Sequence, residues 1–207
     1  MIITISREFG SGGRELGKRL SELLEIPCYD KEIIQMIAKE HGFDEQYVSC
    51  VSEKSIQATY PLTIGRRFGV IPNDVTKQAV TIAVTQKNII ENFAKQGDCI
   101  IIGRCADVIL KDYNPFNIFV YADKAAKLKR CMEHAKDGEN LTLVELEQNM
   151  RTVDKNRARH RDFYTDAKWG ANDNFHLCIN TSGVEIKKLV PVLAEYIKLW
   201  FEIRKTI

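Results

Sequence analysis

A glycine-rich segment near the start of the chain has the residue types that bind phosphate. Gly10, Gly12 and Gly13 follow the β-branched run at 2–6 and precede a helical pattern. Glycines let backbone N–H groups turn toward one point, and the first turn of a helix adds partial positive charge there. The segment therefore predicts a phosphate site. The alternative is a tight strand-to-helix turn without a ligand.

The segment departs from the standard phosphate-binding loop, G-x-x-x-x-G-K-[ST]. With Gly12 at the second glycine, Arg7 takes the place of the first glycine. Gly13 then stands at the lysine, and Arg14 stands at the hydroxyl residue that usually holds Mg²⁺. Arg14 opposes the helix dipole by about 0.3–1 kcal/mol unless an anion binds there, which favours the phosphate site. Mg²⁺ is left to the Ser11 hydroxyl or, through water, to a carboxylate.

Two more polar side chains directly follow predicted strands. Asp30 follows the short apolar run at 26–29, and Arg104 follows the continuous apolar run at 99–102 after one glycine. Ligands of open parallel sheets bind outside the carboxyl ends of the strands, so we expect these residues and the glycine segment at one edge. For Asp30 the alternative is an N-cap of the helix that begins near Lys31.

Residues 149–168 are rich in basic side chains. They hold six Lys or Arg and three Asp or Glu, a local charge of +3 against +2 for the whole chain. Arg157 and Arg161 are four residues apart, so on a helix they share a face and can converge on one anion, as Arg151 and Lys155 can. The alternative is a solvated basic helix.

The remaining pattern predicts an α/β fold. Strand-like runs alternate with helical patterns, which is typical of a parallel, doubly wound sheet. The longest helix is expected at 75–94 and the closing helix at 185–203. The strands are expected at 2–6, 26–29, 99–102, 116–122 and 175–180.

Composition limits the class of protein. The chain has 207 residues, 44% hydrophobic and 28% charged, and its net charge of +2 does not suggest a nucleic-acid partner. Its six cysteines form no C-x-x-C pair, no apolar run approaches the ~20 residues of a membrane span, and the first residues do not look like a signal peptide. We therefore expect a cytoplasmic protein with no membrane and no nucleic-acid partner.

Several motifs together resemble the cytidylate-kinase-like family of P-loop proteins. They occur in the family's order over nearly the whole chain, at 5–17, 26–32, 102–107, 154–157, 163–165, 169–170 and 177–182. The resemblance implies one nucleoside monophosphate kinase domain with a three-layer, five-stranded parallel core at 1–43, 97–148 and 169–207. It also implies a helical substrate-binding insertion at about 44–96 and an arginine-bearing lid at about 149–168.

The same resemblance implies an ATP- and Mg²⁺-dependent transfer of phosphate to CMP, dCMP or another phosphorylated small molecule. Arg104 matches the arginine of a Gly-Arg-Asp motif that holds the acceptor phosphate, while Cys105 replaces the aspartate. Asp30 matches an aspartate near the acceptor, and Arg66 in the insertion is a candidate phosphate or base contact, or else a surface residue. The predicted donor-phosphate site comprises Gly10, Ser11, Gly12, Gly13, Arg14 and Glu15, and the predicted catalytic cations are Arg14, Arg151, Arg157 and Arg161.

Two alternatives remain open at the level of sequence. The missing lysine and Cys105 are consistent with a nucleotide-binding regulatory protein that has lost catalysis, and the acceptor is alternatively a non-nucleotide small molecule. Acceptor phosphates are already nucleophilic, so no histidine needs a catalytic role, and His160 is expected to be solvated. The sequence does not determine whether the protein is a monomer or a homo-oligomer.

Overall fold

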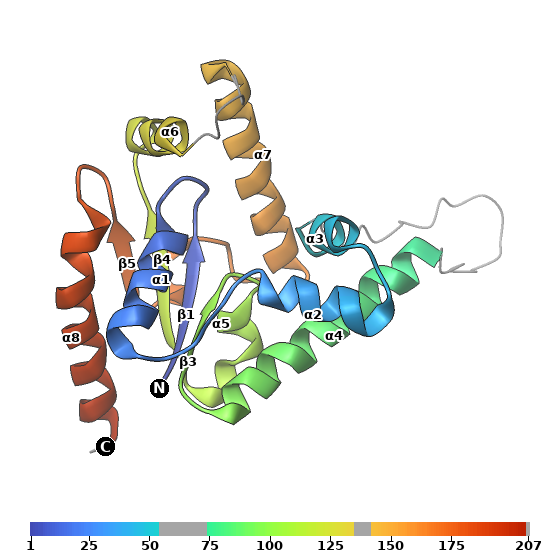
Figure 1. Cartoon of the computed structure of the whole chain (residues 1–207), viewed down its shortest axis with the longest axis horizontal. Helices are drawn as coiled ribbons and strands as arrows, with labels where there is room; N and C mark the ends of the chain where they lie inside the picture. The colour runs from blue at the N-terminus through green and yellow to red at the C-terminus, as the bar shows by residue number, and fades with distance from the viewer. Residues whose placement is uncertain (54–73, 135–141, 206–207) are drawn as a thin grey trace.

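A computed structural model of the chain describes residues 1–53, 74–134 and 142–205 (Figure 1). In chain order the elements are β1 (Ile2–Arg7), α1 (Gly13–Leu24), β2 (Cys28–Tyr29), α2 (Glu32–His41), α3 (Glu45–Glu53), α4 (Asp74–Gln96), β3 (Cys99–Ile102), α5 (Ala106–Ile109), a 3-10 turn at Lys111–Tyr113, β4 (Phe116–Tyr121), α6 (Lys124–Glu133), α7 (Leu143–Asp162), a 3-10 turn at Asn172–Asn174, β5 (Leu177–Asn180) and α8 (Ile186–Lys205).

Five parallel strands form one sheet in the order β2-β3-β1-β4-β5. The central strand β1 pairs with β3 on one side, with Ile3 opposite Ile100, and with β4 on the other, with Ile3 opposite Phe116. β2 and β3 lie on one side of β1, and β4 and β5, which come later in the chain, lie on the other side. The carboxyl end of β1 is therefore the switch point at which sheets of this kind bind their ligands.

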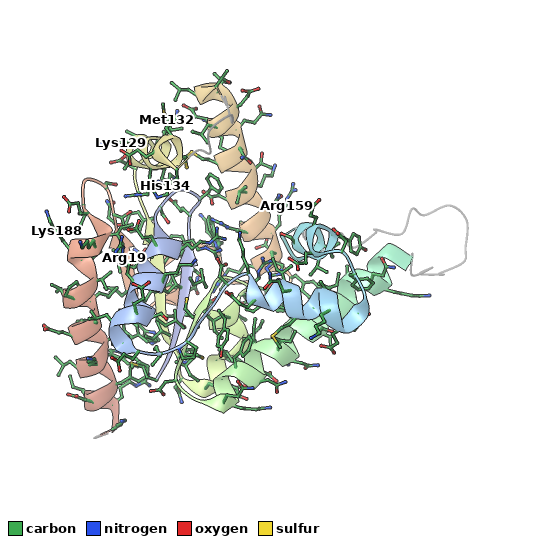
Figure 2. All side chains as sticks on the ribbon, viewed as in Figure 1. Arg19, Lys129, Met132, His134, Arg159 and Lys188 are labelled. Carbon is green, nitrogen blue, oxygen red and sulfur yellow. The ribbon has the colours of Figure 1, made fainter. Side chains whose placement is uncertain are left out.

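Helices cover both faces of the sheet. Ile5 and Ile102 point to the face packed by α1 and α8, whereas Ile101 points to the face packed by α2, α4 and α5. Charged side chains such as Lys129 on α6 and Lys188 on α8 lie on the outside (Figure 2). The three-layer α/β architecture predicted from the sequence is thus confirmed.

Two predicted strands begin later in the structure. β2 begins only at Cys28, because the Ile26 amide donates to Ser21 O at 3.2 Å and Pro27 has no N–H to give. β5 begins at Leu177 rather than at Phe175, whose amide closes the preceding turn by donating to Asn172 O at 3.1 Å. In both cases a local hydrogen bond ends a turn where the apolar pattern alone predicts strand.

The predicted insertion at 44–96 contributes two helices to the described structure. Val48 of α3 is fully buried and Ile82 of α4 is nearly so, and both join the apolar cluster formed by α2 and the sheet. Residues 54–73, which include the predicted substrate contact Arg66, lie outside the described residues. The role of the insertion in binding an acceptor stays a prediction.

The predicted lid at 149–168 corresponds mainly to α7, a single helix of 20 residues. Its start is fixed by a capping box, in which Thr142 and Glu145 exchange hydrogen bonds. Figure 1 shows α7 beyond the carboxyl ends of the strands, with its last turns beside α3. The helix is therefore placed over the switch point, while its movement as a lid stays a prediction.

Candidate functional site

The glycine loop between β1 and α1 requires glycine at two positions with left-handed backbone. Gly10 has φ +72° and Gly12 has φ +80°. A Cβ on Gly10 would lie 2.8 Å from Cys131 Sγ, and a Cβ on Gly12 would collide with Ile186 Cδ1. The loop is therefore packed between α6 and α8 with no room for larger residues.

Several hydrogen bonds hold the loop. The fully buried Ser11 donates its hydroxyl to Glu8 O at 2.8 Å, and Thr181 Oγ1 donates to Ser11 O at 2.7 Å. Arg130, which sequence reasoning missed and no motif indicates, donates to Gly10 O at 2.8 Å and to Thr181 O at 3.1 Å. These bonds link the loop to α6 and to the residue that follows β5.

The amides in the first turn of α1 have no backbone acceptor among the described residues. Ser11 N donates to Glu8 O at 3.3 Å, but within the described chain the amides of residues 12–15 donate to no backbone carbonyl. These are the unsatisfied N–H groups of a helix start, and Gly12, Gly13, Arg14 and Glu15 all line the same cavity. An anion placed there would accept their hydrogen bonds.

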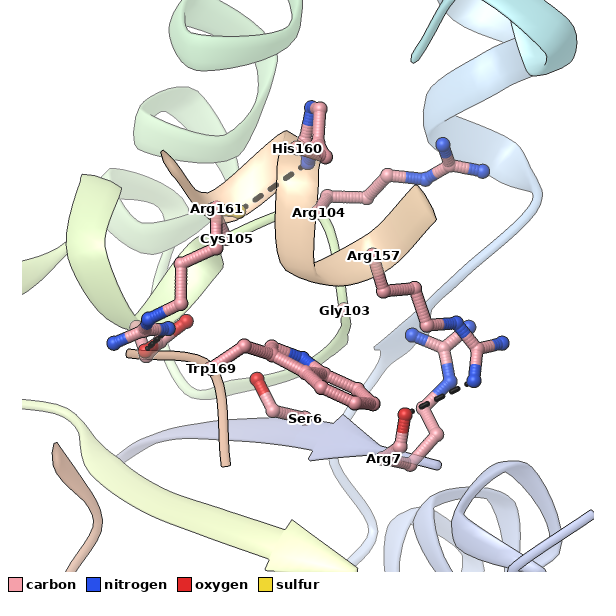
Figure 3. Close-up of a pocket in the computed structure, with 10 residues that line it drawn as sticks. Ser6, Arg7, Gly103, Arg104, Cys105, Arg157, His160, Arg161 and Trp169 are labelled. Atoms are coloured by element: carbon pink, nitrogen blue, oxygen red, sulfur yellow. Dashed lines mark hydrogen bonds and ion pairs between the residues drawn. The ribbon is translucent and has the colours of Figure 1, made fainter. Parts of the chain in front are cut away.

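Four arginines come together beside the loop, and we call this group the arginine junction. Its members are Arg7 at the end of β1, Arg14 in α1, Arg104 after β3 and Arg157 in α7. Figure 3 shows the guanidinium groups of Arg7 and Arg157 side by side, and Arg157 Nη1 donates to Arg7 O at 2.9 Å. Burial, followed by the charge of Arg157, lowers the pKa of Arg7 to about 9.

Asp30 is a carboxylate within this group. Its Oδ2 accepts from Arg14 Nε at 2.5 Å, and its Oδ1 lies 3.5 Å from Arg7 Nη2. The residue that caps α2 is Lys31, and the Asp30 side chain does not cap the helix. Of the two alternatives left open by the sequence, the structure therefore favours a role at the site over the N-cap.

The arginine junction separates two cavities. The larger, about 820 Å³, runs from the glycine loop to α6 and α7, while a second, about 460 Å³, lies between α2, α3 and Arg104. Arg14 lines both. A small pocket of about 50 Å³ shares Arg7 and Arg157 with the larger cavity and Arg104 with the second. We call the larger the donor cavity and the second the acceptor cavity, after the roles that the sequence predicts for the glycine loop and for Arg104 with Asp30.

The turn after β3 is strained at the junction. Gly103 has φ +73°, and the two residues that follow, Arg104 and Cys105, are also left-handed at φ +59° and +53°. Residues other than glycine rarely adopt this left-handed region. Arg104 and Cys105 therefore each store about 1–3 kcal/mol of strain in this turn. Such strain is typical of residues held for function.

The structure does not bring Arg157 and Arg161 together on one anion. Arg161 is 3% exposed, donates to Asp107 Oδ2 at 2.5 Å and to Ala167 O at 3.1 Å, and points to the other side of the pocket in Figure 3. Arg151 is exposed on α7 and is not among the residues that line these cavities. Arg161 does line the small pocket together with Arg157, but its guanidinium is bound to Asp107. Arg157 is the predicted α7 arginine whose guanidinium lies beside that of Arg7.

Two acidic residues also lie near the glycine loop: Glu15, which was predicted as a site residue, and Asp154, which was not. Glu15 lines the donor cavity and accepts from Arg19 Nε at 2.7 Å. Asp154, which sequence reasoning left without a role, accepts from Phe9 N at 2.7 Å and from Arg157 at 3.3 Å, and so ties α7 to the glycine loop. Burial raises the pKa of Asp154 despite these bonds.

His160 is partly buried rather than solvated as predicted. Its Nδ1 lies 3.3 Å from Cys105 Sγ, and burial, helped by the charge of Arg104, lowers its pKa to about 4. Burial also raises the pKa of the Cys105 thiol to about 12. The pair is therefore a neutral thiol beside a neutral imidazole at physiological pH, not an activated nucleophile.

The residues described do not fit a magnesium ion held by the protein itself. The usual hydroxyl position is taken by Arg14, whose guanidinium is bound to Asp30, and the Ser11 hydroxyl is committed to Glu8 O. Among the residues that the structure covers, no group of three or more acidic, histidine or cysteine side chains is arranged to hold a metal. The Ser11 hydroxyl is therefore not arranged to hold Mg²⁺, while a carboxylate acting through water stays a prediction, and Glu8 and Glu15 line the larger cavity.

A five-stranded parallel sheet with a glycine loop at its switch point is the fold of the P-loop kinases. The chain matches the model of the cytidylate kinase-like family over residues 2–183 and belongs to that family. Membership of this family supports phosphoryl transfer, in general terms, as the activity of the chain. No sequence among curated proteins matches the chain.

Solved structures agree with this fold. An uncharacterized protein from Eubacterium ventriosum is 29% identical, with a TM-score of 0.68 over 96% of this chain and 98% of that chain. Shikimate kinase from Bacteroides thetaiotaomicron is 14% identical, with a TM-score of 0.56 over 96% and 98%. Shikimate kinase from Acinetobacter baumannii, in complex with shikimate, is 16% identical, with a TM-score of 0.53 over 95% and 92%. The likeness to the shikimate kinases concerns the fold alone.

In the parts of the chain that the structure describes, no helix combines the length and the apolar character needed to span a membrane.

Proposed function

We propose that the chain transfers the γ-phosphate of ATP to a nucleoside monophosphate, with CMP or dCMP as the first choice of acceptor. The observation that carries the proposal is the junction of four arginines between two cavities. A kinase must hold two polyanions end to end, and a cationic wall shared by two cavities does this. Membership of the cytidylate kinase-like family supports a phosphotransferase in general.

ATP occupies the donor cavity in this proposal. Its phosphates accept hydrogen bonds from the amides of residues 12–15 at the start of α1. Met132, Leu146 and Val153 supply apolar walls farther along the same cavity, where α6 faces α7, and Asn149 supplies a polar group. These side chains suit a nucleoside, which combines a flat apolar surface with polar edges. Mg²⁺ is expected to arrive on the ATP phosphates rather than on ligands of the protein.

The acceptor cavity holds the monophosphate with Arg104 and Arg14 on its phosphate. Asp30 orients Arg14 through the 2.5 Å ion pair. An acceptor phosphate oxygen attacks the γ-phosphorus, the bond to the β–γ bridging oxygen breaks, and ADP leaves with the electron pair. Arg157 balances the charge that develops on the transferred group, and no general base is needed because the attacking oxygen is already anionic. Arg161 acts only through the fold in this scheme, and Arg151 has no assigned contact.

An assay of ADP release tests the proposal. Purified protein with ATP and Mg²⁺ is mixed in turn with CMP, dCMP, UMP, AMP and GMP, and a reaction without acceptor gives the background. We expect CMP or dCMP to raise ADP release by at least about ten-fold, with CDP or dCDP formed in equal amount. Binding of ATP without acceptor-dependent release from any compound would contradict the proposal and favour a regulatory nucleotide-binding protein.

A second candidate acceptor is a non-nucleotide small molecule. Of the described residues that line the acceptor cavity, Ile34 is the one apolar side chain, and none is aromatic. The others are charged or polar, a lining that suits a small polyhydroxylated or phosphorylated acceptor better than a base. In the same assay, sugar phosphates and hydroxy acids should then release ADP while all five monophosphates remain at background.

A further inference from the structure

Arg7 stands where the standard phosphate loop has its first glycine, and Gly13 stands where that loop has its lysine. We propose that these two positions have exchanged roles, so that Arg7 supplies from the end of β1 the cation that the loop lysine supplies from the helix. Arg7 then binds the phosphates of the donor. The inference rests on the proposed function, because it assigns a partner within the same donor cavity.

The first support is that side chains at positions 7 and 13 exclude each other. A Cβ on Gly13 would lie 2.6 Å from Arg7 Cβ and 3.2 Å from Arg7 Cγ, which is closer than real Cβ contacts. Val120 Cβ at 3.3 Å leaves little room for the backbone to give way. Gly13 lies within helix α1 and has no positive φ, so its glycine is explained by this close approach and not by its backbone conformation.

The second support is the course of the Arg7 side chain. A Cβ on Gly103 would collide with Arg7 Nη1, so this glycine leaves space for the guanidinium. The missing side chain of Gly13 thus makes room for the Cβ of Arg7, and that of Gly103 makes room for its guanidinium group. Arg7 lines both the donor cavity and the small pocket at the junction. The guanidinium is therefore at the end of the donor cavity that faces the acceptor.

The third support is the electrostatic state of Arg7. Its side chain is 13% exposed, yet its carboxylate partner Asp30 lies at 3.5 Å and is bound more closely by Arg14 at 2.5 Å. Burial, and after it the like charges of Arg157 and Arg104, lower the pKa of Arg7. A cation buried with so little compensation is stabilised by a bound polyanion, which a structural arginine would not need.

Arg14, by contrast, forms its ion pair with a residue that lines the acceptor cavity. Its side chain is 52% exposed and its Nε is held by Asp30, which lines the acceptor cavity and not the donor cavity. The sequence places the displaced loop cation at Arg14, one residue after Gly13. The geometry assigns that task to Arg7 and leaves Arg14 to bridge the two cavities.

A charge-removal experiment tests the assignment directly. Inorganic tripolyphosphate is titrated by calorimetry into wild type, Arg7→Met and the control Lys188→Met, whose side chain is 76% exposed on α8 away from the site. We expect Arg7→Met to bind tripolyphosphate at least about ten-fold more weakly and Lys188→Met to bind like wild type. Binding by a folded Arg7→Met within about two-fold of wild type would overturn the proposal.

A reciprocal exchange tests the mutual exclusion. Arg7→Gly, Gly13→Lys and the double variant are compared by tripolyphosphate binding, with thermal unfolding as the check of the fold. We expect both single variants to bind weakly, and the double variant to recover at least about five-fold over Arg7→Gly because the lysine now has the space. A folded double variant that binds no better than Arg7→Gly would overturn the exchange. If the double variant does not fold, Arg7→Met decides.

These outcomes separate the inference from the proposed function. If Arg7→Met loses tripolyphosphate binding while no acceptor releases ADP from wild type, then the assignment of Arg7 stands and the proposed transfer fails. If wild type turns over and Arg7→Met binds and turns over equally well, the transfer stands and the assignment of Arg7 fails.

Discussion

Two arginine sites one helical turn apart on α7 differ in how their charge is compensated. Arg161 forms a pair with Asp107 at 2.5 Å, and their side chains are only 4% and 2% exposed. At the arginine junction Arg157 pairs with Asp154 at 3.3 Å and also faces Arg7. The like charges of Arg157, Arg104 and Arg14 surround Arg7, and the Asp30 carboxylate is shared between Arg7 and Arg14. The first site is balanced one to one, and the second carries an excess of positive charge.

This difference separates a structural role from a binding role. Burying a charge costs several kcal/mol unless a partner compensates it, so a balanced buried pair can hold two elements in place. Excess charge beside two cavities is costly in the empty protein and becomes favourable when a polyanion binds. We therefore expect the same residue type on the same helix to serve the fold at 161 and the proposed site at 157.

The largest effect is expected on stability, from the balanced pair. Arg161→Met leaves the buried Asp107 carboxylate without its cation, which should lower the free energy of unfolding by about 3–5 kcal/mol. The measurement is chemical denaturation at neutral pH. The double variant Arg161→Met/Asp107→Leu removes both charges and should recover most of the loss. A single variant as stable as wild type would remove the distinction between the two sites.

The next effect is expected on turnover, from the junction. Arg157→Ala should lower acceptor-dependent ADP release by more than about ten-fold while the melting temperature changes little, because this arginine balances developing charge. Arg159→Ala is the matched control, since Arg159 is exposed on the same helix (Figure 2). Equal activity of Arg157→Ala and Arg159→Ala would take Arg157 out of the site.

The smallest effect is expected on pH dependence, from His160 beside Arg104. The pKa of His160 is about 4 in the folded protein against 6.5 in the unfolded chain. Between these two pH values His160 is therefore protonated in the unfolded chain and neutral in the folded protein. Stability should therefore fall by about 1–3 kcal/mol as pH drops from 6.5 to 4. Denaturation curves of wild type and His160→Gln across this range check it. An equal slope in the two proteins would show that His160 titrates normally.

The fold was predictable because its signals are local. The apolar run at 99–102 indicates a strand buried on both faces, and the periodicity at 75–94 indicates a long helix; β3 and α4 confirm both. The shortened start of β2 was not predictable from apolarity, because it depends on the hydrogen bond between Ile26 and Ser21.

The site was predictable only in outline. Rules for parallel sheets place the glycine loop, Asp30 and Arg104 at one edge, and the structure brings them together there. Spacing of four residues puts Arg157 and Arg161 on one helix face, but it does not reveal that Asp107, 54 residues away in the chain, takes Arg161. The proposed role of Arg7 depends likewise on space left by Gly103, a distant contact that no local pattern contains.

A bisubstrate ligand tests the central claim most directly, namely that two cavities meet at the arginine junction for transfer between two phosphorylated ligands. An adenosine and a cytidine joined through five phosphates is titrated by calorimetry and compared with ATP alone and CMP alone. The account predicts one molecule bound per chain, at least about a hundred-fold more tightly than ATP, because one ligand then fills both cavities. Affinity no greater than that of ATP, with CMP still able to bind afterwards, would contradict it.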